Sequence, residues 1–422
     1  MKLIIREILK NESKAENVAY FSCDSLITNS RNELREAVTF LLERNCKYLF
    51  IDEISNVNEW SYEIKYLIDS GKFDHMKVFI TGSPFGMKEH LPGRKLNYFY
   101  IMPITFRDFI ENLANNINEK TINCFNLNEV EIEQIKGITK QLQQYSCNSI
   151  KIDEFRHKIK FIEIYQGILE KLFKYYVIIG GFPSVINSFI KYKFEGNKVG
   201  LLEEIKTARE RLIDSIRKAN KNEGICFQLI NAIKKRVSSR YSYTQLKETE
   251  IDLSKESIIT YLYHLKSIYL LKIIYAYDFG KREIGLKKNK KLYLIDQFLY
   301  HEGKIIEFEN ILADEEYVSK IIESIIAINL SYLKEDVLNH LEGFLLFWYN
   351  SKEIDFIFKN EEMVAIEVKY RNKVDKPYKI TQIKDYIVLT KNNLKFEMER
   401  VRMAFIPAFL FLLMLKKKES YL

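Results

Sequence analysis

Glycine, proline and paired cysteines are scarce in this 422-residue chain, and each scarcity excludes a class of protein. Only 15 glycines and 6 prolines occur, so the chain has no flexible linker and no low-complexity tract. The five cysteines stand far apart and form no Cys-x-x-Cys pair. A disulfide framework and a zinc site are therefore not expected, and free thiols favour a reducing, cytoplasmic compartment.

Long apolar runs are missing as well. The run Met403–Leu415 is interrupted by Pro407 and is shorter than the about 20 residues that a membrane-spanning helix needs. A buried terminal strand or helix explains it, although the lysines that follow leave a role at a membrane surface open. Near the N-terminus, Arg6 and Glu7 interrupt the early apolar run, which argues against a signal peptide.

Composition and charge allow several globular domains and point to no particular partner. Hydrophobic residues make up 47% of the chain, enough to give a core to each of about two to four domains. The net charge of +8 comes from 65 basic and 57 acidic residues. Such a small excess indicates a partner only where it is concentrated locally.

Strand and helix patterns alternate over residues 1–113. Short apolar runs predict strands at Val18–Ser22, Tyr48–Asp52 and Val78–Thr81, and helical spacing predicts helices at Asn32–Glu43 and Trp60–Asp69. This alternation predicts an α/β domain with a parallel sheet. Ligands bind such sheets at the carboxyl ends of the strands.

Acidic and hydroxyl side chains collect at those strand ends. Asp52 and Glu53 follow a buried strand, which has no structural need for two adjacent carboxylates. Magnesium has such a need, because one carboxylate holds the ion through water while the next acid activates the attacking water. Thr81 and Ser83 end the following strand and would lie beside the γ-phosphate of ATP. An ordinary turn around Gly82 also explains them.

Five motifs follow one another in this region: Phe21-Ser22-Cys23-Asp24, Ile51-Asp52-Glu53-Ile54, Thr81-Gly82-Ser83, Leu91-Pro92-Gly93-Arg94 and Pro103-Ile104-Thr105-Phe106-Arg107-Asp108-Phe109. In order and spacing they resemble a family of prokaryotic, mainly archaeal, AAA-type P-loop ATPases that carry a C-terminal domain of unknown function. The resemblance implies ATP and Mg²⁺ as ligands, Asp52 and Glu53 as the Walker B pair, and a sensor segment at Thr81 and Ser83. It makes Arg94 a phosphate-facing arginine or one at a subunit interface of a homo-oligomer, unless Arg94 simply lies in a surface loop.

The chain lacks the phosphate-binding loop of that family. None of the pairs Gly71-Lys72, Gly280-Lys281 and Gly303-Lys304 has the earlier glycine of GxxxxGK[ST]. The β- and γ-phosphates therefore lose their backbone cradle and their lysine. In the family this loop precedes the helix that here starts at Met1, so either the natural start lies upstream or the product is truncated. We expect weak ATP binding by the chain as given.

A helical lid region is predicted over residues 114–222, and a winged helix-turn-helix over residues 223–303. The latter rests on helices at Phe227–Lys235 and Tyr243–Leu246, a helix capped by Ser254, and strands at Tyr269–Tyr275 and Lys291–Ile295. Six cations are concentrated in this wing: Lys281, Arg282, Lys287, Lys288, Lys290 and Lys291. Such density favours the phosphate backbone of DNA, although a wing that only braces neighbouring domains has the same features.

Residues 304–422 are predicted to form an α/β domain that resembles the restriction-endonuclease-like PD-(D/E)xK nucleases. Two alternating strands carry Asp355 on the polar face of one, and Glu367 and Lys369 on the polar face of the next. In such folds the carboxylates hold a metal ion and the lysine steadies the attacking water or the scissile phosphate. Glu323 would add an upstream acid. A half-exposed hairpin with a salt bridge is the alternative.

The sequence therefore predicts a P-loop NTPase core of the AAA type, a helical middle region, a winged helix and a nuclease-like domain, acting on DNA. The alternative is a non-catalytic module that binds nucleic acid or protein, with degenerate ATPase and nuclease sites.

Overall fold

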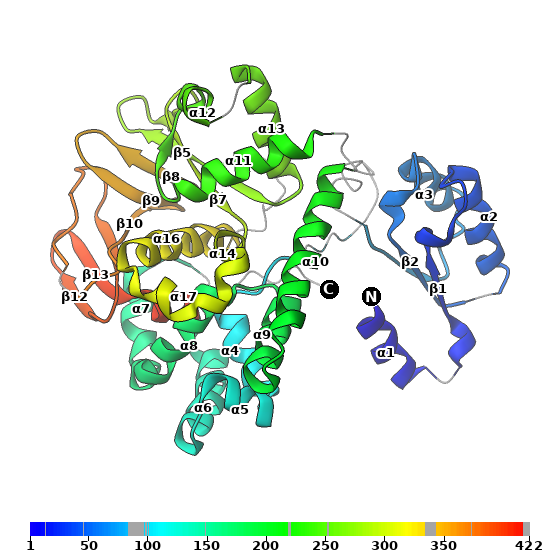
Figure 1. Cartoon of the computed structure of the whole chain (residues 1–422), viewed down its shortest axis with the longest axis horizontal. Coiled ribbons are helices and arrows are strands. Elements are labelled where there is room, and N and C mark those ends of the chain that lie inside the picture. Colours follow the sequence, from blue (N-terminus) through cyan, green and yellow to red (C-terminus); the bar gives the residue numbers. More distant parts are fainter. Residues whose placement is uncertain are drawn as a thin grey trace. The chain divides into compact units, whose positions relative to one another are not determined.

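A computed structural model describes residues 1–12, 14–44, 46–82, 97, 99, 101–147, 149–217, 221–250, 253–333, 343–372 and 374–416 (Figure 1). Contacts divide the chain into two compact units. The first comprises Met1–Tyr98 with Ser215–Lys221, and the second comprises Phe99–Asp214 with Asn222–Leu422. Ser83 and Arg94 lie outside the described residues.

The first unit contains a three-stranded parallel sheet with its most apolar strand in the middle. The strand order is β1 (Val18–Ser22), β2 (Tyr48–Asp52) and β3 (Lys77–Ile80). The helices α2 (Arg31–Leu42) and α3 (Trp60–Asp69) connect these strands. The predicted parallel α/β arrangement is confirmed, and each strand lies within one residue of its predicted bounds.

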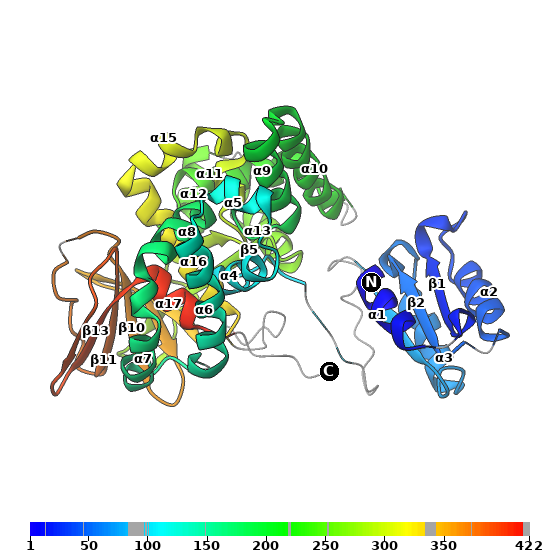
Figure 2. The same ribbon diagram turned by 90° about the horizontal axis from the view of Figure 1, so that it is seen from below.

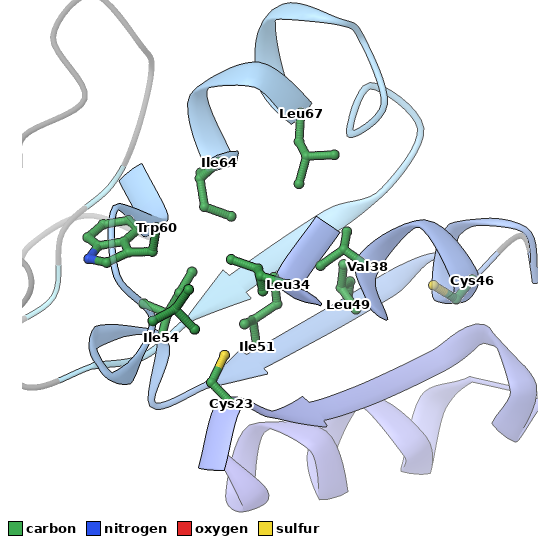
Figure 3. Close-up of a cluster of buried hydrophobic side chains, with 11 residues drawn as sticks. Cys23, Leu34, Val38, Cys46, Leu49, Ile51, Ile54, Trp60, Ile64 and Leu67 are labelled. Atoms are coloured by element: carbon green, nitrogen blue, oxygen red, sulfur yellow. The ribbon is translucent and has the colours of Figure 1, made fainter. Parts of the chain in front are cut away.

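The core of this unit lies between the sheet and its two connecting helices (Figure 3). Leu49 and Ile51 of β2 pack with Leu34 of α2 and Ile64 of α3, and all four side chains are fully buried. Side chains of a strand alternate between its two faces, so Phe50 belongs to the opposite face, where its ring stacks on Phe79 at 4.7 Å. Burial of β2 on both faces explains why its sequence is a continuous apolar run.

Helix α1 (Lys2–Asn11) is amphipathic but contributes no buried residue to this core. Leu3, Ile4 and Leu9 are exposed, with Leu3 at 68%, whereas Ile5 and Ile8 are partly buried. The predicted helical pattern of residues 3–9 is therefore confirmed, while its apolar side chains are covered only in part within the described residues.

The second unit is built on a ten-stranded mixed sheet. Its path has the order β12-β13-β11-β10-β9-β8-β5-β7-β4, and β6 (Glu283–Ile284) pairs with β5. The strands are β4 (Arg240–Tyr241), β5 (Leu271–Asp278), β7 (Lys290–Leu294), β8 (Leu345–Tyr349), β9 (Glu353–Lys359), β10 (Met363–Val368), β11 (Asp385–Thr390), β12 (Lys395–Met398) and β13 (Arg402–Pro407). Because β5 pairs with β8, the strands predicted for the wing and for the nuclease-like domain share one sheet.

The predicted helical middle region is confirmed. It consists of α4 (Phe106–Asn115), α5 (Glu119–Phe125), α6 (Glu129–Tyr145), α7 (Ile152–Lys158), α8 (Gln166–Ile179), α9 (Pro183–Glu195) and α10 (Lys198–Arg217). Gly180 ends α8 with a positive φ of 83°, a backbone conformation that glycine adopts at no steric cost. Figure 2 shows α7 beside β13 at one side of this unit.

The remaining helices pack on the sheet or on other helices. They are α11 (Glu223–Lys235), α12 (Tyr243–Glu250), α13 (Lys255–Ser267), α14 (Phe298–His301), α15 (Phe308–Ala313), α16 (Glu315–Ser331) and α17 (Ala408–Met414). The terminal apolar run forms both β13 and α17, and every residue of α17 is buried. No helix in the described part of the chain has the length and apolar character needed to cross a bilayer.

Candidate functional site

The carboxylate of Asp52 is fixed at the end of the central strand of the first unit. Asp52 is the last residue of β2, and Thr81 directly follows β3. The Thr81 hydroxyl donates to Asp52 Oδ1, and the Tyr20 hydroxyl of β1 donates to Asp52 Oδ2 at 2.8 Å. The backbone N–H of Thr81 donates to the carbonyl of Ile51 at 2.9 Å. The parallel pairing of the strands thus brings the two predicted residues Asp52 and Thr81 together.

The hydrogen bonds keep Asp52 ionised. Partial burial by itself raises the pKa of Asp52, but the hydroxyl donors Thr81 and Tyr20 outweigh this effect and lower it. The same bond to Asp52 raises the pKa of Tyr20. A charged carboxylate with a fixed orientation suits a hard cation held directly or through water.

Glu53 adopts an unusual backbone conformation next to Asp52. Its φ of 53° and ψ of 39° lie in the left-handed region, which costs a non-glycine residue of the order of 1–3 kcal/mol and is concentrated at functional sites. The backbone N–H of Glu53 also donates to the Thr81 hydroxyl at 3.3 Å. The backbone at the end of β2 therefore holds Asp52 and Glu53 beside Thr81.

Two further polar residues at this sheet edge were missed by the sequence analysis. Tyr20 bonds to Asp52, and the Asn56 side-chain amide donates to Asp24 Oδ1 at 2.5 Å. Tyr20 reads in the sequence as one more apolar strand residue, so only the pairing of β1 with β2 identifies its role. Cys23 is fully buried, and burial raises the pKa of its thiol to about 12, which keeps it unreactive.

A second group of predicted residues meets on the sheet of the second unit. The antiparallel register of β9 and β10 pairs Phe356 with Ile366, and Asp355 and Glu367 are the chain neighbours of these two residues. The backbone N–H of Val368 donates to Asp355 Oδ2 at 2.9 Å. Lys369 Nζ lies 2.8 Å from Glu367 Oε2. Asp355, Glu367 and Lys369 therefore lie close together, as the alternation of both strands indicates.

Lys291 reaches the same acidic group from β7. Its Nζ lies 2.9 Å from Glu323 Oε1 of α16 and 3.0 Å from Asp355 Oδ1. It lies 2.6 Å from Glu353 Oε1 at the start of β9. The Tyr293 hydroxyl donates to Glu323 Oε1 at 2.6 Å. Neither Glu353 nor Tyr293 was expected here, because strand patterns do not reveal which strands become neighbours.

Burial shifts the titration of these acids. Burial raises the pKa of Glu323 to about 7, and the nearby charge of Asp355 adds to this rise. Burial also raises the pKa of Glu367, against the lowering effect of Lys369. Glu367 Oε1 is buried and finds no hydrogen-bond partner among the described residues. Within those residues, no three His, Cys, Asp or Glu side chains are arranged so as to hold a metal ion as they stand.

The structure corrects the expectation that all six wing cations face a partner. Lys281, Arg282 and Lys287 are exposed, and Lys288 pairs with Asp278 at 2.9 Å. Lys290 is buried, with Nζ donating at 2.7 Å to the carbonyls of Leu286 and Lys288. Lys291 is fully buried among acids. Lys290 and Lys291 are therefore unavailable to a phosphate backbone, because the strand that carries them lies inside the sheet.

Comparisons with known proteins find a described domain type for the first unit and a domain of unknown function within the second unit. A family model described as an AAA domain matches residues 2–110, and a model described as a domain of unknown function matches residues 170–307. An uncharacterised protein of Methanocaldococcus jannaschii is 26% identical over 392 residues, covering 89% of this chain and 76% of the relative. No solved structure matches the chain significantly. Residues 2–110 of the first unit are thus similar to an AAA domain.

Proposed function

We propose that the chain is an AAA-type ATP-binding protein that acts on DNA and, when its phosphate site is complete, hydrolyses ATP. The observation that carries this proposal is the Asp52 carboxylate, fixed by Thr81 and Tyr20 at the carboxyl end of a parallel sheet. Ligands bind parallel sheets at this edge, and the AAA-domain match covers the same residues.

Each residue at this edge has a distinct proposed role. Asp52 would hold Mg²⁺ through water, since its charge and orientation suit a hard cation. Glu53 would orient and activate the attacking water, and Thr81 would sense the γ-phosphate position. Bound Mg²⁺ would neutralise charge that develops on the phosphates. Ser83 and Arg94 remain proposed sensor and phosphate or subunit-interface residues, the latter in a homo-oligomer.

The proposal predicts different nucleotide behaviour with and without a phosphate cradle. The sequence contains no GxxxxGK[ST], so the chain as given should bind Mg²⁺–ATP weakly. Adding a strand and a GxxxxGKT loop before Met1 should strengthen binding, measured by calorimetry, and produce phosphate release. In that extended protein, Glu53→Gln should preserve binding and reduce turnover by a factor of about 100 or more.

Glu16→Gln serves as the matched control, because it also removes one carboxylate from the first unit but lies before β1, at the other end of the strand from Asp24. Tight Mg²⁺–ATP binding by the unextended chain would contradict the role assigned to the missing cradle. Unchanged turnover in the extended Glu53→Gln protein would contradict the role of Glu53.

The proposed action on DNA rests on the module formed by residues 223–303. Helices α11, α12 and α13 pack on one another, and β4 and β5 flank β7, with the chain order α11-β4-α12-α13-β5-β6-β7. This order and the exposed cations Lys281, Arg282 and Lys287 at the β5–β7 turn support a winged helix whose wing contacts phosphates.

A non-catalytic role for the C-terminal site is the second candidate, and Lys291 is the observation that favours it. Asp355, Glu323, Glu367 and Lys369 support a PD-(D/E)xK-like arrangement in which the acids would hold a metal ion. However, a lysine ammonium already lies against two of these acids. The nuclease-like region would then serve in binding DNA or protein without cutting it.

A further inference from the structure

A fully buried ammonium group lies at the centre of the acidic cluster in the second unit. The Lys291 side chain is 0% exposed, and its Nζ lies within 3.0 Å of oxygens of Glu323, Glu353 and Asp355. A buried charge is costly unless it is paired and hydrogen-bonded. The Lys291 ammonium and the three carboxylates therefore compensate one another's charge. Removal of the lysine or of the carboxylates would leave an uncompensated charge inside the protein.

Three carboxylates converge on Lys291 Nζ, although as they stand they do not form a metal site. The Tyr293 hydroxyl holds Glu323 Oε1, and the Val368 N–H holds Asp355 Oδ2, which orients both carboxylates. Three carboxylate oxygens thus surround one point at 2.6–3.0 Å. Without the lysine, these oxygens would have to move inward to reach the about 2.0–2.1 Å that Mg²⁺ requires.

Glu367 is a further buried acid beside this cluster. It is 4% exposed, and its Oε1 has no hydrogen-bond partner among the described residues. Burial raises the pKa of Glu367, and the charge of Asp355 adds a smaller rise, so the two acids lie within electrostatic reach of each other. A buried carboxylate oxygen without a donor is satisfied most directly by a cation or its bound water.

The protein's own cations already balance most of the negative charge. Arg240 Nε lies 3.1 Å from Glu353 Oε2, and Lys369 Nζ lies 2.8 Å from Glu367 Oε2. Three cations (Lys291, Arg240 and Lys369) therefore face four acids (Glu323, Glu353, Asp355 and Glu367), so the net charge is −1 when all four acids are ionised and less negative when Glu323 or Glu367 holds a proton. A divalent ion added to this set would be left with excess positive charge.

We propose that Lys291 takes the place of a divalent metal ion at the acidic cluster and closes a Mg²⁺ or Mn²⁺ site formed by Glu323, Glu353 and Asp355. The natural chain would then hold no metal at this position. Removal of the Lys291 amine would open the site to a hard divalent cation, which prefers such carboxylate oxygens. This inference does not depend on nucleotide binding by the first unit.

Mn²⁺ binding and thermal stability of the full chain test the proposal without any activity assay. All proteins carry Asp52→Asn and contain no nucleotide, so that the first unit contributes no metal site. With Lys291 present, Mn²⁺ should not bind the cluster and should leave Tm unchanged. Lys291→Ala should lower Tm in EDTA, and Mn²⁺ at about 100 times its Kd should raise it again by about 5 °C or more.

Two control variants separate metal binding from simple destabilisation. Lys290→Ala removes the neighbouring buried lysine, whose Nζ bonds to backbone carbonyls, and Mn²⁺ should not restore its stability. Lys291→Ala combined with Glu323→Gln and Asp355→Asn should bind no Mn²⁺, because two of the three ligands are neutral.

Two results would overturn the proposal. One is a Mn²⁺ site in the Lys291-containing protein that Glu323→Gln or Asp355→Asn abolishes, since the ion and the lysine would then coexist. The other is a folded Lys291→Ala protein that gains neither bound Mn²⁺, counted by electron paramagnetic resonance, nor stability from it. If Lys291→Ala folds only when Mn²⁺ is present during refolding, the proposal is supported.

Discussion

At the scale of single residues, the junction between α8 and α9 depends on two glycines beside a buried acid. The Gly181 N–H donates to Asp296 Oδ2 at 2.7 Å, and the Phe298 N–H donates to Asp296 Oδ1 at 2.8 Å. A Cβ on Gly180 would lie 2.0 Å from Asp296 Oδ1. A Cβ on Gly181 would lie 2.2 Å from the Ile104 carbonyl oxygen. The glycines therefore cap the helix and also allow the backbone to approach Asp296.

Gly180→Ala should lower the free energy of unfolding by more than about 2 kcal/mol, because the new Cβ meets Asp296 and the φ of 83° disfavours alanine. Urea denaturation of the full chain measures this change. Gly167→Ala is the matched control, since a Cβ there meets nothing within 4 Å in the first turn of α8. The control should be neutral or up to about 1 kcal/mol more stable. Equal losses in both variants would contradict the close approach.

At the scale of elements, the β5–β7 hairpin serves two purposes at once. Its antiparallel pairs run from Leu271–Leu294 to Tyr275–Lys290, and β5 continues the sheet through β8. Strands β5 and β7 therefore form part of the sheet. The exposed cations Lys281, Arg282 and Lys287 lie in the segment that connects them. This separation divides the six predicted cations into exposed and buried groups according to their position along the hairpin.

Replacing Lys281, Arg282 and Lys287 with alanine should weaken duplex DNA binding and reduce the slope of log K against log salt by about 0.9 for each phosphate that these cations neutralise. Fluorescence anisotropy at several salt concentrations measures both quantities. Alanines at Lys136, Lys151 and Lys206, which are equally cationic and exposed, form the control. An unchanged affinity and slope in the turn variant would identify the hairpin as a brace between structural elements.

At the scale of the whole molecule, the buried acid Asp296 makes stability depend on pH. Burial raises its pKa to about 7, although the N–H donors of Gly181 and Phe298 oppose this rise. The folded chain thus binds the Asp296 proton more tightly than the unfolded chain. The resulting stability is complete below the unfolded pKa of about 3.9 and is lost as pH rises through about 7.

From pH 5.5 to pH 8 this single group should lower the free energy of unfolding by about 2 kcal/mol. Asp296→Asn should be less stable at pH 5.5, because the amide cannot accept both backbone hydrogen bonds, but its pH dependence should be flatter. Glu323, with a pKa raised to about 7, contributes in the same direction and leaves part of the slope in the variant. An identical slope in both proteins, measured by urea denaturation, would contradict the role of Asp296.

Local sequence determined the strands and connecting helices of the first unit and the parallel character of its sheet. The strand Tyr48–Asp52 is a continuous apolar run because both of its faces are buried, and this cause can be recognised without a structure. Ser254 caps α13 by accepting from the Ser257 N–H, which is also a local interaction. The acids at strand ends could be predicted for the same reason, since parallel strands bring their carboxyl ends to one edge.

Only the tertiary structure decided what the central lysines contact. Alternation along a strand indicates which residues share a face but not which helix or strand lies against that face. Lys290 and Lys291 therefore read as part of a basic surface, whereas pairing of β7 with β5 and packing of α16 bury them. Glu323 lies 32 residues from Lys291 and Asp355 lies 64 residues away. Contacts between such distant segments depend on the assembled sheet, where burying one charge requires the others.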